Sequence, residues 1–172
     1  METGQKNKSR AEKEMFLKNE MQITFDAISV NEAFARIAVA AFVTPLNPTI
    51  EEVSDIKTAV SEAVTNAIIH GYDTEFMKEE NGEAPNKVYL NCRIEADVLY
   101  VEVKDKGKGI ADIEQAMEPL FTTKPEMDRS GMGFAFMEAF MDDLEVVSKL
   151  GIGTVVRMKK KLGISPWIEY EE

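Results

Sequence analysis

The stretch "SEAVTNAIIHGYD" (residues 61–73) decides how the rest of the chain is interpreted. A helix has 3.6 residues per turn, so Glu62, Asn66 and His70 recur on one stripe, while mostly apolar residues cover the remaining surface. Burying an unpaired carboxylate costs several kcal/mol, whereas an aliphatic side chain at the same place would gain about 1.5 to 3 kcal/mol. The stripe is therefore expected to line a cleft.

The side chains of this stripe suit charge chemistry. Asn66 offers an amide oxygen to a hard cation, and Glu62, one turn earlier, can accept a proton beside that cation. The alternative for Glu62 is a solvated glutamate or one paired with a lysine. For His70, near the predicted helix end, capping of the last carbonyl groups is the simpler interpretation.

Composition restricts the class of protein. The 172 residues carry 20 basic and 31 acidic side chains, a formal net charge of −11, which argues against a nucleic-acid-binding surface. The single cysteine, Cys92, cannot form an internal disulfide, no apolar run reaches membrane-spanning length, and no signal-peptide pattern opens the chain. We expect a cytoplasmic protein with one domain, without direct nucleic-acid or membrane partners.

Helix signals in the first half predict a helical hairpin. Ser29 followed by Glu32 makes a capping-box pattern before an apolar helix over about 31–43. Asn47 and Pro48 suit the N-cap and first position of a second helix, which continues through the opening stretch.

Alternating residues predict strands around and after this hairpin. "MQITFDA" (21–27) alternates, residues 87–95 and 98–105 form a predicted β-hairpin, and residues 145–161 form a second one. Cys92 falls on the apolar side of its strand, so it is predicted to be a core residue rather than a nucleophile.

Helices combined with such a sheet predict an α+β fold, a two-layer α/β sandwich with a mixed, mostly antiparallel sheet covered by helices. A short helix near 112–118, a helix in 131–144 and an exposed loop over 73–86 complete the prediction. The chain is expected to divide into a disordered extension, one domain and a C-terminal tail: 1–17, 18–162 and 163–172.

Two glycine-rich segments carry the remaining chemistry. Asp105 leaves a predicted strand and precedes Gly107 and Gly109, which permit close approach to a flat or anionic ligand, although this pattern is more often only a turn. "FTTKPEMDRSGMGF" (121–134) ends in Gly-x-Gly at a helix start, where exposed amides and the helix dipole favour phosphate. The alternative for that loop is a flexible connector with a glycine hinge.

Taken in order, these segments resemble the nucleotide-binding boxes of the GHKL superfamily (Bergerat fold), which includes gyrase, histidine kinases and MutL. "EAVTNAIIHG" resembles its N box, "DKGKG" its first glycine box, "SGMGF" the end of its ATP lid, and "GIGT" its last box. From about Lys18 to Lys161 the chain is similar, more closely, to the sporulation anti-sigma factors within this superfamily.

That resemblance implies a function. Such proteins bind a sporulation sigma factor, keep it from RNA polymerase, and use Mg-ATP to phosphorylate a serine on an anti-anti-sigma antagonist protein. It implies a homodimeric protein serine kinase that takes ATP and Mg²⁺. The alternatives are a nucleotide-gated sigma-binding module without phosphotransfer, and a histidine-kinase module, which is disfavoured because the only histidine, His70, lies inside the N box.

The same resemblance assigns roles to individual residues. Glu62 would be the base that activates the antagonist's serine, Asn66 would hold Mg²⁺, and Arg36, unless it is merely a solvated arginine, would contact protein partners. Asp105 would accept the adenine amino group, with Thr154 at the same end. The residues expected to bind the nucleotide are Asn66, Asp105, Gly107, Gly109, Ser130, Gly131, Met132, Gly133 and Thr154.

Overall fold

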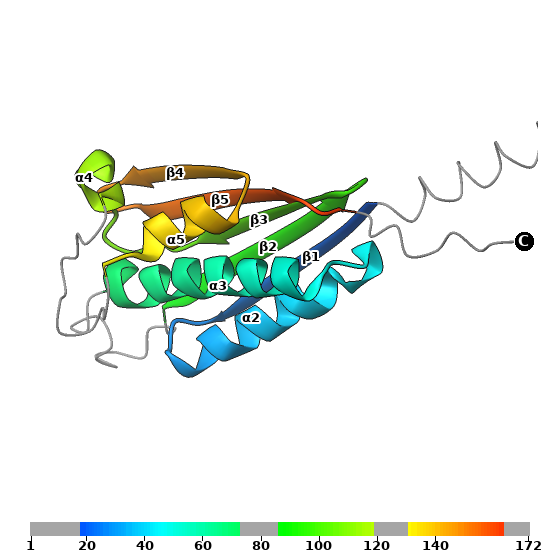
Figure 1. The fold of residues 1–172 in the computed structure, drawn as a ribbon. Helices are drawn as coiled ribbons and strands as arrows, with labels where there is room; N and C mark the ends of the chain where they lie inside the picture. Colours follow the sequence, from blue (N-terminus) through cyan, green and yellow to red (C-terminus); the bar gives the residue numbers. More distant parts are fainter. Residues whose placement is uncertain (1–17, 73–85, 119–130, 164–172) are drawn as a thin grey trace, which may run out of the picture.

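The computed structural model describes residues 18–72, 86–118 and 131–163. Within them, five strands form one sheet in the order β1-β2-β3-β5-β4, and every neighbouring pair is antiparallel (Figure 1). The strands are β1 (Lys18–Asp26), β2 (Lys87–Glu95), β3 (Val98–Lys104), β4 (Asp143–Lys149) and β5 (Gly153–Lys161).

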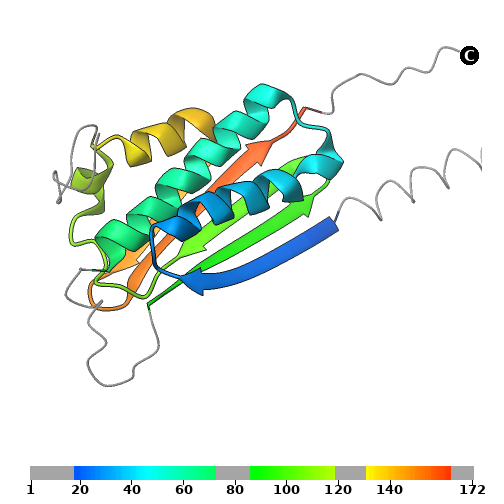
Figure 2. The same ribbon diagram turned by 90° about the horizontal axis from the view of Figure 1, so that it is seen from below.

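Three helices cover one face of this sheet: α2 (Val30–Phe42), α3 (Ile50–Asn66) and α5 (Gly133–Phe140). Figure 2 shows α3 lying between α2 and α5, and the short helix α4 (Ile113–Met117) lies at one end of the sandwich. The predicted α+β two-layer sandwich and the helical hairpin of α2 and α3 are confirmed. Residues 1–17 and 164–172 lie outside the described residues, so the predicted division of the chain remains a prediction.

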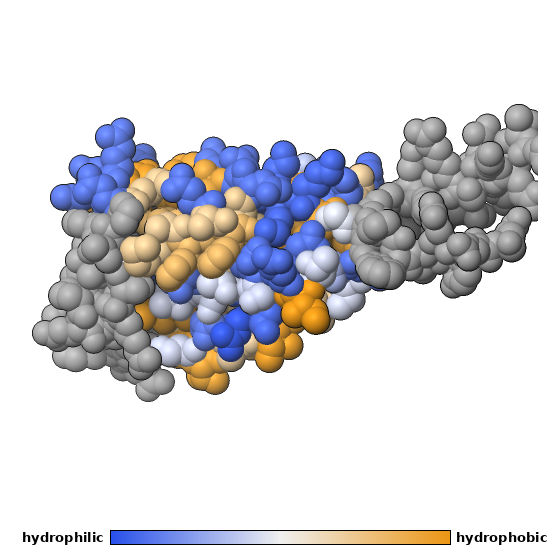
Figure 3. Space-filling view, in the orientation of Figure 1, coloured by the Kyte–Doolittle hydropathy of each residue, from blue (hydrophilic) through white to orange (hydrophobic). Residues whose placement is uncertain are grey.

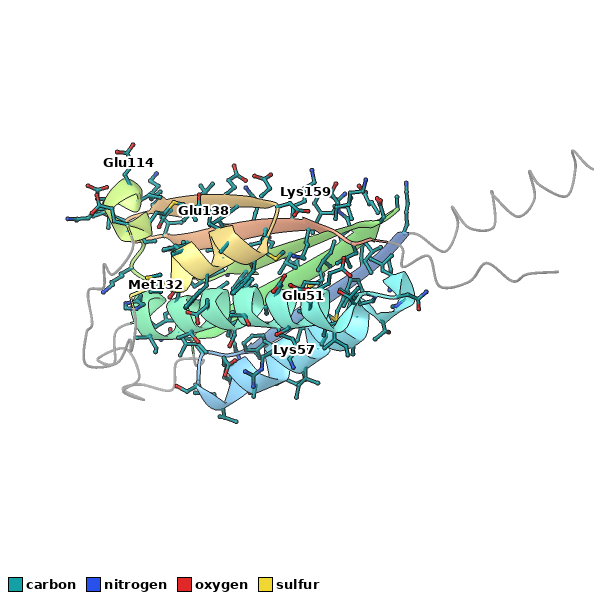
Figure 4. The ribbon with its side chains drawn as sticks, viewed as in Figure 1. Glu51, Lys57, Glu114, Met132, Glu138 and Lys159 are labelled. Atoms are coloured by element: carbon teal, nitrogen blue, oxygen red, sulfur yellow. The ribbon has the colours of Figure 1, made fainter. Side chains whose placement is uncertain are left out.

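The core lies between the sheet and the helical layer. As predicted, alternate residues of β2 are buried: Val88, Leu90, Cys92 and Ile94. Burial raises the pKa of the Cys92 thiol to about 12, so this side chain is inert core, as expected. Residues of the opposite parity, such as Arg93 and Tyr100, lie on the face that the helices leave uncovered, and Figure 4 labels Lys159 on that side.

The capping predicted for both long helices is wrong, although α2 begins within one residue of its predicted start. Ser29 has helical backbone angles and its side chain caps nothing, because the Glu32 carboxylate accepts a hydrogen bond from Ser61 on α3 instead. Asn47 adopts a left-handed conformation that closes a 3₁₀ turn, and α3 begins after Thr49. Thr49 and Glu52 form a complete capping box there, which satisfies two backbone donors that the helix start would otherwise leave unpaired.

The helix predicted over 131–144 is also shorter than expected. It runs from Gly133 to Phe140, and Met141 is already extended. The Lys160 ammonium donates to the Phe140 carbonyl at 2.6 Å and lies 3.2 Å from the Asp55 carboxylate on α3. This lysine therefore closes the end of α5 and fixes it against α3, and Leu144, at the end of the predicted helix, belongs to β4.

Candidate functional site

One cavity of about 360 Å³ brings together the four motifs. It lies between the C-terminal part of α3, the glycine turn after β3, the start of α5 and the β4–β5 hairpin. The predicted site residues that line it are Asn66, Asp105, Gly109, Gly131, Gly133 and Thr154. Ser130 lies outside the described residues.

Asp105 is a buried carboxylate at the wall of this cavity, with 4% of its surface exposed. The backbone N–H groups of Gly107 and Thr154 both donate to its Oδ1, at 2.8 and 3.2 Å. Burial raises the pKa of Asp105, and these hydrogen bonds offset the increase only in part. Because both donors use Oδ1, Oδ2 is left as an acceptor for a group in the cavity.

Glycines allow the turn after β3 to approach the end of α3. A Cβ atom on Gly107 would lie 1.8 Å from the carbonyl oxygen of Gly71, so no other residue fits there. The Lys108 N–H donates to that same carbonyl at 2.8 Å. Gly109 has a φ of +76°, a conformation that favours glycine. The structure therefore requires glycine at position 107 for packing against the end of α3, and the close approach to a ligand remains a prediction.

The polar stripe of the opening stretch lines the cavity only in part, because Glu62 is not among the lining residues. Asn66 is the last residue of α3, and His70 lies in the wider π-helical turn Ala67–Gly71 that follows; both line the cavity. A Cβ atom on Gly133 would lie 3.1 Å from Glu62 Oε2 and 3.2 Å from Asn66 Nδ2. The half-buried Glu62 carboxylate and the Asn66 amide thus both lie against the first residue of α5.

The start of α5 supplies backbone amides to the same region. Gly131 has a φ of +59°, Met132 is the N-cap, and Figure 4 labels Met132 beside the C-terminal turns of α3. The first N–H groups of a helix lack partners within the helix, and the helix dipole adds positive potential there. This turn is suited to an anion.

The rest of the cavity wall is largely apolar. Its apolar residues are Ala63, Ala67, Val103, Ile110, Ala111, Ala116, Phe134, Ala135, Leu150 and Val156. An apolar slot with a carboxylate at its wall suits a flat ring that carries a hydrogen-bond donor.

Sequence reasoning missed residues that hold the site together. The Tyr72 hydroxyl accepts from the Lys106 N–H at 2.8 Å and donates to the Lys87 carbonyl at 2.6 Å, which ties the glycine turn to the start of β2. Ser148 on β4 hydrogen-bonds to the Thr154 hydroxyl at 2.8 Å. Their only signals were the "GY" that ends the stripe and a polar residue on the inward side of an alternating strand.

Arg36 is not among the residues that line the cavity. Its guanidinium lies 3.6 Å from the Glu32 carboxylate, and 41% of its side chain is exposed. The exposed apolar side chains of Val30, Phe34 and Ile37 lie on the same helix, α2. Figure 3 shows apolar surface along this edge of the molecule, below α3.

Comparison with known proteins gives the family. The model of the histidine kinase-like ATPase domain matches residues 25–160. The chain is 53% identical over 149 residues to the Anti-sigma F factor of Bacillus subtilis (strain 168), covering 87% of this chain and 97% of that relative. The chain belongs to the anti-sigma F factor family. Another member, from Geobacillus sp. (strain WCH70), is 54% identical over 144 residues, or 84% of this chain and 93% of the relative.

A solved structure shares the fold of this anti-sigma F family member. The RsbU and RsbW domains of a protein from Mycobacterium tuberculosis match with a TM-score of 0.57 and 19% identity, covering 84% of this chain. The match spans 32% of that longer chain, and at 19% identity the likeness concerns the fold alone. Among the helices of the described residues, none is long and apolar enough to cross a membrane.

Proposed function

We propose that this chain is a cytoplasmic protein serine kinase that sequesters a sporulation sigma factor and phosphorylates a serine of an anti-anti-sigma antagonist with Mg-ATP. The observation that carries the proposal is the meeting of Glu62, Asn66 and the start of α5 around Gly133. A carboxylate, an amide oxygen and the positive end of a helix suit, respectively, a base, a hard cation and an anion. Transfer of a phosphoryl group from ATP to a serine can use all three, because it depends on positioning the reactants and on neutralising the charge around the phosphates.

The other end of the cavity fits the adenine base. Oδ2 of Asp105 would accept from the exocyclic amino group, since Oδ1 is already occupied by Gly107 and Thr154. The apolar wall would enclose the ring, and Gly107 and Gly109 would keep the base pocket open by letting their turn pack against the Gly71 and Lys149 carbonyls. Thr154 would lie beside the same edge of the base.

The phosphates would lie toward α5. Backbone amides of Ser130, Gly131, Met132 and Gly133 would hold the phosphate oxygens, and Asn66 would hold Mg²⁺, which neutralises phosphate charge. In the proposed transfer, the antagonist's serine oxygen attacks the γ-phosphorus while Glu62 takes the hydroxyl proton. The bond from that phosphorus to the β–γ bridging oxygen breaks, and ADP leaves with the electron pair.

Two surfaces would serve the protein partners. Arg36 would contact the sigma factor and the antagonist, supported by the exposed apolar side chains on α2. Strand β1 lies at the edge of the sheet, where its outer backbone groups can pair with another strand, so a homodimer would form along it.

The test is a transfer assay with γ-labelled ATP, Mg²⁺, this protein, its sigma factor and its antagonist. Label on an antagonist serine, together with release of captured sigma factor before the antagonist is phosphorylated, is the expected result. Capture of sigma factor that depends on ATP but leaves the antagonist unlabelled would replace the kinase by a nucleotide-gated sequestering module.

A further inference from the structure

We propose that Ser148 is a positioning residue that makes the Thr154 hydroxyl an acceptor toward the cavity. The part of the cavity beside Asp105 and Thr154 is thereby selective for a purine ring that bears an amino group. The inference rests on the proposed function in requiring that a purine nucleotide enters the cavity with its exocyclic group toward Asp105 and Thr154. Ser148 is not among the residues that line the cavity and acts through Thr154, its neighbour across the β4–β5 pair.

The Ser148 hydroxyl has three hydrogen-bond partners. The Ile110 N–H donates to it at 2.8 Å, it lies 3.1 Å from the carbonyl oxygen of Gly153, and the Thr154 hydroxyl lies at 2.8 Å. Ile110 can only donate and the Gly153 carbonyl can only accept, whereas the contact with Thr154 can run in either direction.

The number of protons on Ser148 determines the direction of the hydrogen bond between the two hydroxyl groups. Ser148 has one proton and two lone pairs, so all three contacts are hydrogen bonds at once only if its proton goes to Gly153. The Ile110 N–H then fills one lone pair and the Thr154 proton the other. Thr154, which lines the cavity, consequently has no proton left for a ligand, so its hydroxyl oxygen can serve a ligand there only as an acceptor.

The acceptor role of the Thr154 hydroxyl determines which purine ring is bound preferentially. Asp105 and Thr154 are linked by a hydrogen bond from the Thr154 N–H, and both line the cavity. Two neighbouring acceptors match the N–H groups of an exocyclic amino group, whereas a ring carbonyl placed there faces acceptors only. A buried acceptor left without a donor costs affinity, which is how such sites reject close analogues.

The experiment compares ATP with ITP, which has a carbonyl where adenine has its amino group. Dissociation constants are measured by calorimetry for the wild type, Ser148→Ala and Ser148→Thr. Removing the hydroxyl frees the Thr154 proton to turn toward the cavity, so the ratio Kd(ITP)/Kd(ATP) should fall about tenfold in Ser148→Ala. Ser148→Thr keeps a hydroxyl and should keep the ratio.

A double-mutant cycle separates positioning from structural support. In Thr154→Val, which lacks the hydroxyl, the ratio should already be low, and adding Ser148→Ala should not change it further. A parallel loss of both affinities in Ser148→Ala, an unchanged ratio, or an effect that persists in the Thr154→Val background would each overturn the assignment. Absence of nucleotide binding by the wild type would instead refute the proposed function, and the inference with it.

Discussion

Replacing Asp105 with asparagine tests two consequences of burying this carboxylate: its effect on ATP affinity and its effect on folding stability. The asparagine amide is nearly isosteric, and its oxygen can still accept from the N–H groups of Gly107 and Thr154. Its NH₂ group then takes the place of Oδ2 and presents donors to the cavity. A nucleotide amino group, itself a donor, would lose its acceptor and meet another donor.

The expected magnitude follows from the type of bond that is lost. A hydrogen bond to a charged group contributes roughly 1.5 to 3 kcal/mol, so ATP affinity should fall by about 10- to 150-fold. The free energy of unfolding, in contrast to the ATP affinity, should not fall at neutral pH. Burial raises the pKa of Asp105 in the folded protein, so the folded state binds its proton more tightly than the unfolded state does.

The pH dependence has a definite sign. The contribution of Asp105 to stability is fully present below the ordinary aspartate pKa and is lost as pH rises through the raised pKa of the folded protein. The free energy of unfolding of Asp105→Asn should therefore fall less than that of the wild type as pH rises over that interval. At pH 7 the variant should be at least as stable as the wild type. Asp143→Asn, at an exposed aspartate on β4, is the matched control and should change neither quantity.

Calorimetric titration with ATP and thermal unfolding between pH 4 and pH 8 provide the two measurements. Unchanged ATP affinity in Asp105→Asn would place the base elsewhere. A variant that is much less stable than the wild type at pH 7 would contradict the conclusion that the buried charge is a cost to folding.

Two further substitutions test the glycine turn and the partner surface. Gly107→Ala places a methyl group on the Gly71 carbonyl and should lower the free energy of unfolding by about 3 kcal/mol in urea, whereas Gly151→Ala, with a φ of +73° and open space around it, should cost only about 1 kcal/mol. Equal losses would mean that the close approach to Gly71 is not what demands glycine. Arg36→Ala should weaken sigma-factor capture at least tenfold in a pull-down titration and leave ATP affinity unchanged. Normal capture, or an equal loss in Arg93→Ala on the uncovered sheet face, would remove Arg36 from the partner surface.

Local patterns predicted the elements whose signals lie within one segment. The two-residue period of β2 describes what the structure shows, and two residues of the polar stripe, Asn66 and His70, line the cavity as predicted. Local patterns did not predict helix caps and helix ends that are set by residues distant in the sequence. Ser29 and Glu32 match a capping box, yet Ser61 on the neighbouring helix takes the carboxylate. The end of α5 is set by Lys160, twenty residues after Phe140, and the apolar run at that point has no internal stop signal.

The residues of the candidate site also fall into two groups: those that local motifs predicted and those that depend on segments distant in the sequence. Glu62, Asn66 and Asp105 could be found because polar residues at inward positions are unusual and lie in recognisable motifs. Tyr72 and Ser148 act on backbone groups of segments far from them in sequence, such as Lys106 and Ile110. No spacing rule connects these segments before the sheet order is known.

The rate of phosphate transfer by Glu62→Gln at saturating ATP tests the central claim most directly. If Glu62 takes the serine proton, transfer to the antagonist should fall by about 100- to 10,000-fold while the dissociation constant for ATP stays unchanged. Glu51→Gln, in the exposed first turn of α3 and labelled in Figure 4, should transfer at the wild-type rate. Transfer by Glu62→Gln at the wild-type rate would contradict the account and require a different base.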